Sequence, residues 1–242
     1  MEYTLEKCSL YEKQMIGDTP IIIFEKHNMA LPVWGTFANR LKQSLRLITF
    51  DFHADTHDPF AVAVGPHDFD LKRFEKDVLN VTQHGINDFK FEDVYRLSCD
   101  YVFHDEHILT AYKFEYINGY HVFCELPDYE LSDYESYDRR RHINAFYHAR
   151  SDIRSMADEE IQKLGSIPFI LDFDLDYFTS SNMFDAVLVN NLSFLIKNAI
   201  AITIAREPHY FELEKTETDF NNDDALHLLL NLIQTAINGS LL

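Results

Sequence analysis

Short apolar runs alternate along the chain with longer segments of mixed polarity. The runs are rich in β-branched and aromatic residues, which favour strands, and they lie at 20–25, 46–51, 120–125, 168–174 and 199–205. The segments between them predict helices at about 29–43, 70–80, 151–164, 184–197 and 223–237. The last helix follows the cap-like sequence "NNDD" and carries on one face Leu226, Leu229, Leu230 and Ile233.

Continuous apolar runs separated by helices are typical of parallel strands that are buried on both faces. The pattern therefore predicts a three-layer α/β/α fold around a central, mainly parallel sheet. Only seven glycines and seven prolines are scattered through the 242 residues, and no repeat or linker interrupts them, so we expect a single domain over 1–242.

The charge of the chain excludes one class of partner. Forty acidic residues against 21 basic ones give a net charge of −19, whereas a nucleic-acid-binding protein needs a basic surface. Metal cations and cationic substrates are favoured instead, although a solvated acidic surface also accounts for the charge.

The chain shows no sign of a membrane segment or of a disulfide framework. Its longest apolar stretches, at 225–233 and 199–205, are too short to span a bilayer, and the N-terminus lacks an apolar leader. The spacing of Cys8, Cys99 and Cys124 fits neither a zinc site nor a redox pair. We therefore expect reduced thiols and a cytoplasmic protein.

Potential metal ligands follow the second apolar run. Asp51, His53 and Asp55 stand at alternate positions, so in extended chain they share one face. Carboxylates this close repel one another unless a cation lies between them, and carboxylate oxygens with an imidazole suit Mn²⁺ or a similar first-row ion. The alternative is a strand end with solvated carboxylates and a capping histidine.

The same alternation ends the fourth run, with Asp172, Asp174 and Asp176. Carboxylates on a buried strand are costly without a compensating cation. His27 follows the first run, one strand–helix–strand step before Asp51, so the two can be neighbours. Together these strand ends offer enough ligands for two metal ions.

His27, the Asp51-Phe-His53-Ala-Asp55 run and the Asp172-Phe-Asp174 run resemble the metal-binding signature of the arginase/agmatinase (ureohydrolase) superfamily. Order and approximate spacing match over about 150 residues. The strings "EKHNMALPVW", "DFHADTH", "LDFDLDYF" and "ITIAREP" resemble most the divergent arginase-like family that contains the peptide arginases of ribosomal peptide (RiPP) biosynthesis. The resemblance implies an arginase/deacetylase-like fold.

The resemblance also implies two Mn²⁺ ions per chain. The first would be held by His27, Asp51, Asp55 and Asp172, and the second by Asp51, His53, Asp172 and Asp174. Asp51 and Asp172 would bridge the ions. Asp176 has no ligand role in the family pattern and is expected to orient a ligand or bind substrate.

The residues for proton transfer and for substrate binding match the family pattern less well than the metal ligands do. The histidine loop of the familiar arginases is missing from its usual place, although "GPHD" with His67 lies near it in spacing and "QHG" with His84 resembles it in letters. His57 is our first choice for proton transfer and His104 our second, with His107 as a further option. For the guanidinium we expect Glu207, which precedes a proline after the last strand, as in arginases. A surface glutamate paired with Arg206 is the alternative.

The expected activity is hydrolysis of arginine side chains to ornithine and urea, as a post-translational modification of an arginine-containing precursor peptide. The chain is short for an arginase, so trimmed loops would leave room for a peptide. A homo-oligomer is possible.

The alternatives are a zinc deacetylase or other amidohydrolase of the same fold, and a non-catalytic metal-binding peptide carrier; the motifs of metallophosphoesterases are missing from the sequence. The stretch 128–138 is expected to be a solvated surface loop, with a loop at the mouth of the active site as the alternative, and 209–220 is expected to be a surface loop near the site.

Overall fold

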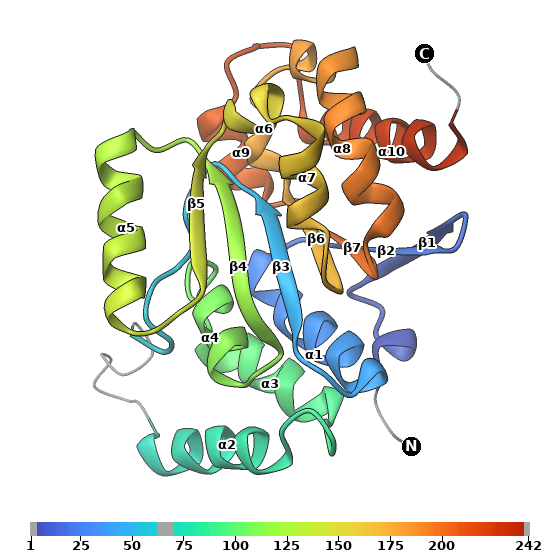
Figure 1. Ribbon diagram of the computed structural model, residues 1–242. Helices are drawn as coiled ribbons and strands as arrows, with labels where there is room; N and C mark the ends of the chain where they lie inside the picture. Colours follow the sequence, from blue (N-terminus) through green and yellow to red (C-terminus); the bar gives the residue numbers. More distant parts are fainter. Residues whose placement is uncertain (1–3, 62–69, 240–242) are drawn as a thin grey trace.

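The computed structural model describes residues 4–61 and 70–239. Its centre is a sheet with the strand order β1-β2-β7-β6-β3-β4-β5, in which only β1 is antiparallel to its neighbour (Figure 1). In this order the strands are β1 (Glu12–Ile16), β2 (Thr19–Phe24), β7 (Ala201–Ala205), β6 (Phe169–Asp174), β3 (Leu45–Phe50), β4 (Ile117–Cys124) and β5 (Ala145–Ala149). The carboxyl ends of six parallel strands therefore lie along one edge.

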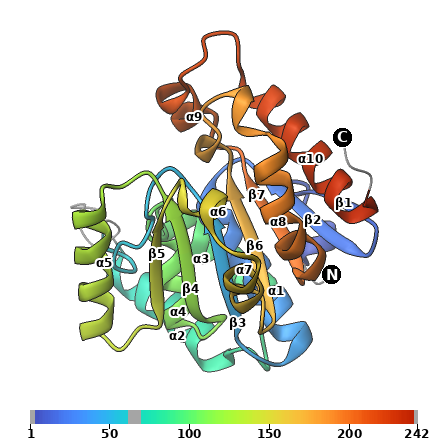
Figure 2. The same ribbon diagram turned by 45° about the horizontal axis from the view of Figure 1, so that its top comes forward.

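Helices cover both faces of the sheet, as Figures 1 and 2 show. On one face, an apolar core joins the strands to α1 (Ala30–Leu41), α2 (Leu71–His84), α3 (Phe91–Tyr101), α4 (His107–Lys113) and α5 (Asp128–Arg140). On the other, a second core joins them to α6 (Asp152–Ser155), α7 (Asp158–Leu164), α8 (Ala186–Asn198), α9 (Pro208–Glu214) and α10 (Asn222–Asn238). Short 3-10 turns complete the described chain, namely η1 (Leu5–Lys7), η2 (His27–Met29), η3 (Leu175–Tyr177) and η4 (Ser181–Met183). The predicted three-layer α/β/α fold is confirmed.

The five predicted strands and the helices α1, α2, α8 and α10 are all present. The N-terminus of α10 forms as its sequence predicts, since the Asn221 side chain accepts a hydrogen bond from the backbone N–H of Asp224. The helix expected at 151–164 is instead two helices. The chain is extended at Met156, and the Glu160 carboxylate accepts a bond from the Ala157 N–H, so a new helix begins there.

The segment 128–138, expected to be a loop, forms most of helix α5. The face of this helix that points to the core also carries polar residues, so the sequence does not show the apolar periodicity that would predict a helix. Leu131 packs into the core, and the buried Asp138 carboxylate accepts hydrogen bonds from the hydroxyls of Tyr120 at 2.5 Å and Tyr147 at 2.7 Å. The second expected loop, 209–220, is likewise helical in its first half, where it forms α9.

The described helices do not reach the length and apolar content that crossing a bilayer requires.

Candidate metal centre

The register of the three central strands decides which carboxylates meet. Asp172 on β6 lies opposite Thr49 on β3 and Thr203 on β7. Phe173 pairs with Phe50, so the next residues, Asp174 and Asp51, lie one step further toward the carboxyl edge. Because alternate residues share a face, Asp51 and Asp174 stand together at the rim, with Asp172 one pleat deeper.

His27 forms the centre of the cluster. It follows β2 in turn η2 and is fully buried. Its Nδ1 lies 3.2 Å from Asp51 Oδ2, 3.3 Å from Asp55 Oδ2 and 3.1 Å from Asp174 Oδ2. One imidazole nitrogen thus faces three carboxylates from two chain segments, the run that follows β3 and the end of β6.

The expected bridging role of Asp172 does not fit this geometry. Asp172 Oδ2 contacts the other ring nitrogen of His27, Nε2, at 2.8 Å and accepts from the Thr49 hydroxyl at 2.8 Å, while Oδ1 accepts from the Thr203 hydroxyl at 2.5 Å. Its oxygens are therefore occupied by protein donors on the far side of the imidazole. Asp172 orients His27 and fixes Nδ1 as the nitrogen that is available to a metal.

Asp176, expected to act outside the ligand set, instead faces His53. Its Oδ2 lies 3.3 Å from His53 Nδ1, while its Oδ1 accepts from the Phe52 N–H. Asp176 also lines the same cavity as Asp51, Asp55 and Asp174, which Asp172 does not. In this geometry Asp176 faces the cavity that the other carboxylates line, whereas Asp172 lies behind the imidazole of His27.

The electrostatics of the cluster call for a cation. Burial, together with repulsion from Asp51, raises the pKa of Asp55 well above its ordinary value, and burial with repulsion from Asp176 does the same for Asp174. Burial and Asp51 raise the pKa of Asp176 to about 6. The hydrogen bond to Asp176 raises the pKa of His53 to about 9 although burial opposes it. Burial disfavours charge on His27 as well, but Asp172 and the surrounding carboxylates hold its pKa well above the usual range.

Several buried polar atoms in this cluster have no hydrogen-bond partner among the described residues. They include His27 Nδ1, Asp51 Oδ2 and Nε2 of His107. Potential ligand atoms lie within 4.8 Å of one another in three overlapping groups: His27/Asp51/Asp174, Asp51/His53/Asp55 and His27/Asp55/His107. Unpartnered acceptors converging on one volume are what a divalent cation needs, so the residues present fit the expected metals.

Glu207 lies at the edge of the same cluster. Its Oε1 accepts a hydrogen bond from the His27 N–H at 2.8 Å, and its backbone is left-handed, with φ 36° and ψ 59°. Such a conformation is strained in a residue with a side chain and is found at functional sites. Pro208 then begins α9, so the sequence "EP" turns the carboxylate back toward His27. Its neighbour Arg206 binds Glu25 and Asp223 instead, which argues against a surface pair with Glu207.

The two histidines expected to transfer protons both line the cavity above the carboxylates. His57 Nδ1 lies 2.7 Å from Asp105 Oδ2, and the side chain is 61% exposed. His104 Nε2 lies 2.7 Å from the Tyr210 hydroxyl. His67 lies outside the described residues.

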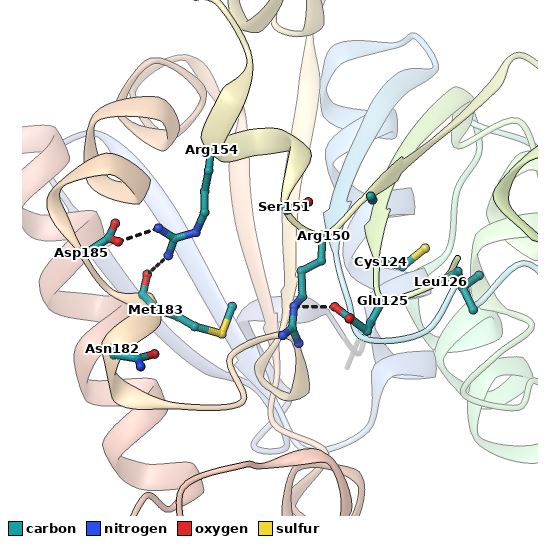
Figure 3. A pocket seen from close by; sticks show the side chains of 10 residues that line it. Cys124, Glu125, Leu126, Arg150, Ser151, Arg154, Asn182, Met183 and Asp185 are labelled. Atoms are coloured by element: carbon teal, nitrogen blue, oxygen red, sulfur yellow. Dashed lines mark hydrogen bonds and ion pairs between the residues drawn. The ribbon is translucent and has the colours of Figure 1, made fainter. Parts of the chain in front are cut away.

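The cavity has a volume of about 180 Å³ and shares lining residues with three larger hollows. It shares Glu207, His104 and Tyr210 with one of about 540 Å³, and His57 and Tyr134 with another of about 470 Å³. Leu126 connects it to a third, of about 570 Å³, in which Arg150 pairs with Glu125 and Arg154 with Asp185 (Figure 3). Each of the three hollows therefore adjoins the cavity at one or more residues.

Comparison with known proteins bears on the fold alone. No family model matches the chain, and a search of curated proteins found no match either. Among solved structures, Trypanosoma cruzi formiminoglutamase with Mn²⁺ is similar over 91% of this chain and 65% of its own, with 12% identity and a TM-score of 0.56. The chain has an arginase-type fold.

Two further structures share this fold. Proclavaminate amidino hydrolase from Streptomyces clavuligerus matches over 90% of this chain and 63% of its own, with 10% identity and a TM-score of 0.51. A hypothetical agmatinase from Burkholderia thailandensis matches over 89% and 59%, with 17% identity and a TM-score of 0.50. The chain therefore spans less than two thirds of the length of these arginase-type proteins.

Proposed function

We propose that this protein is a binuclear manganese hydrolase of the ureohydrolase type, which cleaves the C–N bond of a guanidinium group. The observation that carries the proposal is the placement of His27 Nδ1, unpartnered and buried, within 3.3 Å of three carboxylates. One ion would be held by His27, Asp51, Asp55 and Asp174, and the other by Asp51, His53, Asp174 and Asp176. Asp51 and Asp174 would be shared.

The bound ions would supply a water of lowered pKa as the nucleophile. The residues of the chain provide the remaining functions. Glu207 would hold the guanidinium nitrogens, because a carboxylate matches the planar donors of that cation. Its hydrogen bond from the His27 backbone fixes it beside the ligand cluster.

His57 is suited to give a proton to the leaving amine. It lines the cavity, and Asp105 fixes the orientation of its ring through Nδ1, which leaves Nε2 for proton transfer. His104 has its Nε2 engaged by Tyr210 and is the second candidate.

The named neighbours support this class of chemistry, since formiminoglutamase, an amidino hydrolase and an agmatinase are among the proteins of this fold. We further propose that the substrate is an arginine within a peptide, which would be converted to ornithine with release of urea. The narrow central cavity suits a single side chain, and the larger hollows beside it could accommodate the flanking residues. A precursor peptide of ribosomal peptide biosynthesis is the proposed partner.

A deacetylase is the second candidate, and Tyr210 is the observation that favours it. Zinc deacetylases of this fold use a tyrosine beside the metal, and the Tyr210 hydroxyl lines the cavity next to His104. Such an enzyme would need one zinc ion and would have no use for Asp55 as a ligand.

Mass spectrometry distinguishes these functions. Manganese-loaded protein is incubated with arginine peptides, with an acetyl-lysine peptide and with free arginine. The proposal predicts the loss of one CN₂H₂ unit per modified arginine and the appearance of urea. Reaction of free arginine alone would overturn the peptide substrate but keep the chemistry, whereas loss of acetyl from lysine alone would overturn both.

A further inference from the structure

His107 is a buried histidine that belongs to none of the sequence motifs of the proposed metal centre. It is the first residue of helix α4 and is fully buried. Its ring lies 4.0 Å from the ring of His27 and 5.3 Å from that of Trp34, measured between centroids. A second imidazole therefore packs directly against the one that faces the carboxylates.

The hydrogen bond of His107 determines which of its nitrogens carries the proton. Nδ1 lies 2.5 Å from the backbone carbonyl oxygen of His104. A carbonyl oxygen can only accept, so Nδ1 must donate its N–H. In a neutral ring the lone pair is then on Nε2.

That lone pair is buried and has no partner in the described part of the chain. A potential ligand atom of His107 lies within 4.8 Å of those of His27 and Asp55. The neighbouring atoms His27 Nδ1 and Asp51 Oδ2 also have no hydrogen-bond partner there, and both are acceptors when the neutral His27 ring carries its proton on Nε2, facing Asp172. One water molecule donates only two hydrogen bonds and cannot serve all of these atoms, whereas a cation can.

We propose that His107 Nε2 is a further ligand of the ion held by His27 and Asp55. The inference rests on the proposed metal centre and adds a residue to it. A second imidazole would make this position more selective for a first-row transition metal over Mg²⁺ or Ca²⁺, which prefer oxygen ligands. The Nδ1–H bond to the His104 carbonyl is the arrangement that orients histidine ligands in metal sites.

The test is the affinity of each site for Mn²⁺ in His107→Phe, measured by equilibrium dialysis. Phenylalanine keeps a ring against His27 and Trp34 but removes the lone pair. His121→Phe is the matched control, because His121 is also buried but contacts Arg46 and His148 instead of the cluster. We expect one of the two sites to weaken by at least about tenfold in His107→Phe and neither in the control. Wild-type affinity at both sites in a folded His107→Phe protein would overturn the inference.

Nitrogen NMR of the unaltered protein gives a test that needs no variant. On titration with diamagnetic Zn²⁺, the resonances of His27 Nδ1 and His107 Nε2 should move together into the range of metal-bound imidazole. Movement of His27 alone would overturn the role of His107 and leave the proposed function intact. No movement of either would overturn both.

Discussion

Asp172 and Asp176 differ most from the family pattern at the scale of single residues. Asp172 contacts His27 Nε2, Thr49 and Thr203, whereas Asp176 contacts His53 at the cavity. Asp176→Asn should therefore lose one of two bound metal ions. Asp172→Asn should keep both, with affinity lowered about 10- to 100-fold, because it disturbs a ligand only through its orientation. Metal analysis after dialysis measures both, and the reverse pattern would restore the order expected from the family motif.

Glu207 allows a second prediction at this scale. Glu207→Gln keeps an acceptor for the His27 N–H but removes the charge that a guanidinium needs. A hydrogen bond to a charged group contributes about 1.5–3 kcal/mol, so kcat/KM should fall about 10- to 100-fold. Steady-state urea release measures the change. Glu6→Gln, at an exposed carboxylate that pairs with Arg40 and lines neither the cavity nor its neighbouring hollows, is the control and should leave kcat/KM unchanged. Equal losses in both variants would argue against a substrate role for Glu207.

The motifs in the sequence indicated the strand ends that meet in the cluster but could not decide among the three aspartates at the end of β6 and in the turn η3 that follows it. Asp172, Asp174 and Asp176 alternate with the same period, so each is an equally good partner for Asp51 in a sequence pattern. The register of β6 against β3, with Phe173 opposite Phe50, determines which of these aspartates lies beside Asp51. A sequence pattern does not contain this register, because strand pairing depends on contacts between residues distant in sequence. His107 was considered only for proton transfer, because its proximity to the metal cluster depends on the packing of α4 against His27.

At the scale of elements, β4 and β5 share a histidine pair, in which His121 is buried and His148 half-buried. His121 Nδ1 lies 3.1 Å from His148 Nε2, and burial lowers the pKa of His121 to about 3. Above pH 6.5 the ring is neutral in both folded and unfolded chains. Below pH 6.5, His121 is protonated in the unfolded chain but stays neutral in the folded chain. The free energy of unfolding therefore falls as the pH falls toward 3.

His121→Phe should remove this contribution. Between pH 6.5 and 5, the free energy of unfolding should fall by about 2 kcal/mol more in the unaltered protein than in the variant. Urea titrations at a series of pH values measure the difference, and the other titrating groups are common to both proteins. Parallel pH profiles would show that His121 takes up its proton without unfolding.

Elements were predicted where the apolar pattern was continuous and missed where it was not. The central strands are buried along their whole length, as β6 and β7 show. The edge strand β1, with the sequence EKQMI, is mostly exposed and carries no such signal. In α5 the inward positions include Tyr134 and Asp138, whose burial depends on Tyr120 and Tyr147 in the neighbouring strands.

At the scale of the whole molecule, the cluster links the sheet to the layer of α1. Its residues come from the ends of β2, β3 and β6, and the carboxylates repel one another when no cation is bound. Chelation should therefore lower the melting temperature. An ion present at 1,000 times its dissociation constant stabilises the fold by about 4 kcal/mol, and calorimetry with and without chelator measures this. An unchanged melting temperature would mean that the cluster does not bind the ion.

The fold class was predictable because it depends on the order of buried strands and intervening helices, which the sequence carries locally. The shape of the cavity and its three neighbouring hollows was not, because side chains from α3, α5 and α9 line them. The peptide substrate depends on these hollows and so remains a prediction.

Metal content per chain tests the central claim most directly. Protein purified after growth with manganese should contain about two Mn²⁺ per chain by plasma mass spectrometry, and Asp174→Ala, which removes a proposed shared ligand, should lose most of the metal and the activity. One zinc per chain would indicate the deacetylase instead. No bound metal, or a fully active Asp174→Ala protein, would contradict the binuclear centre.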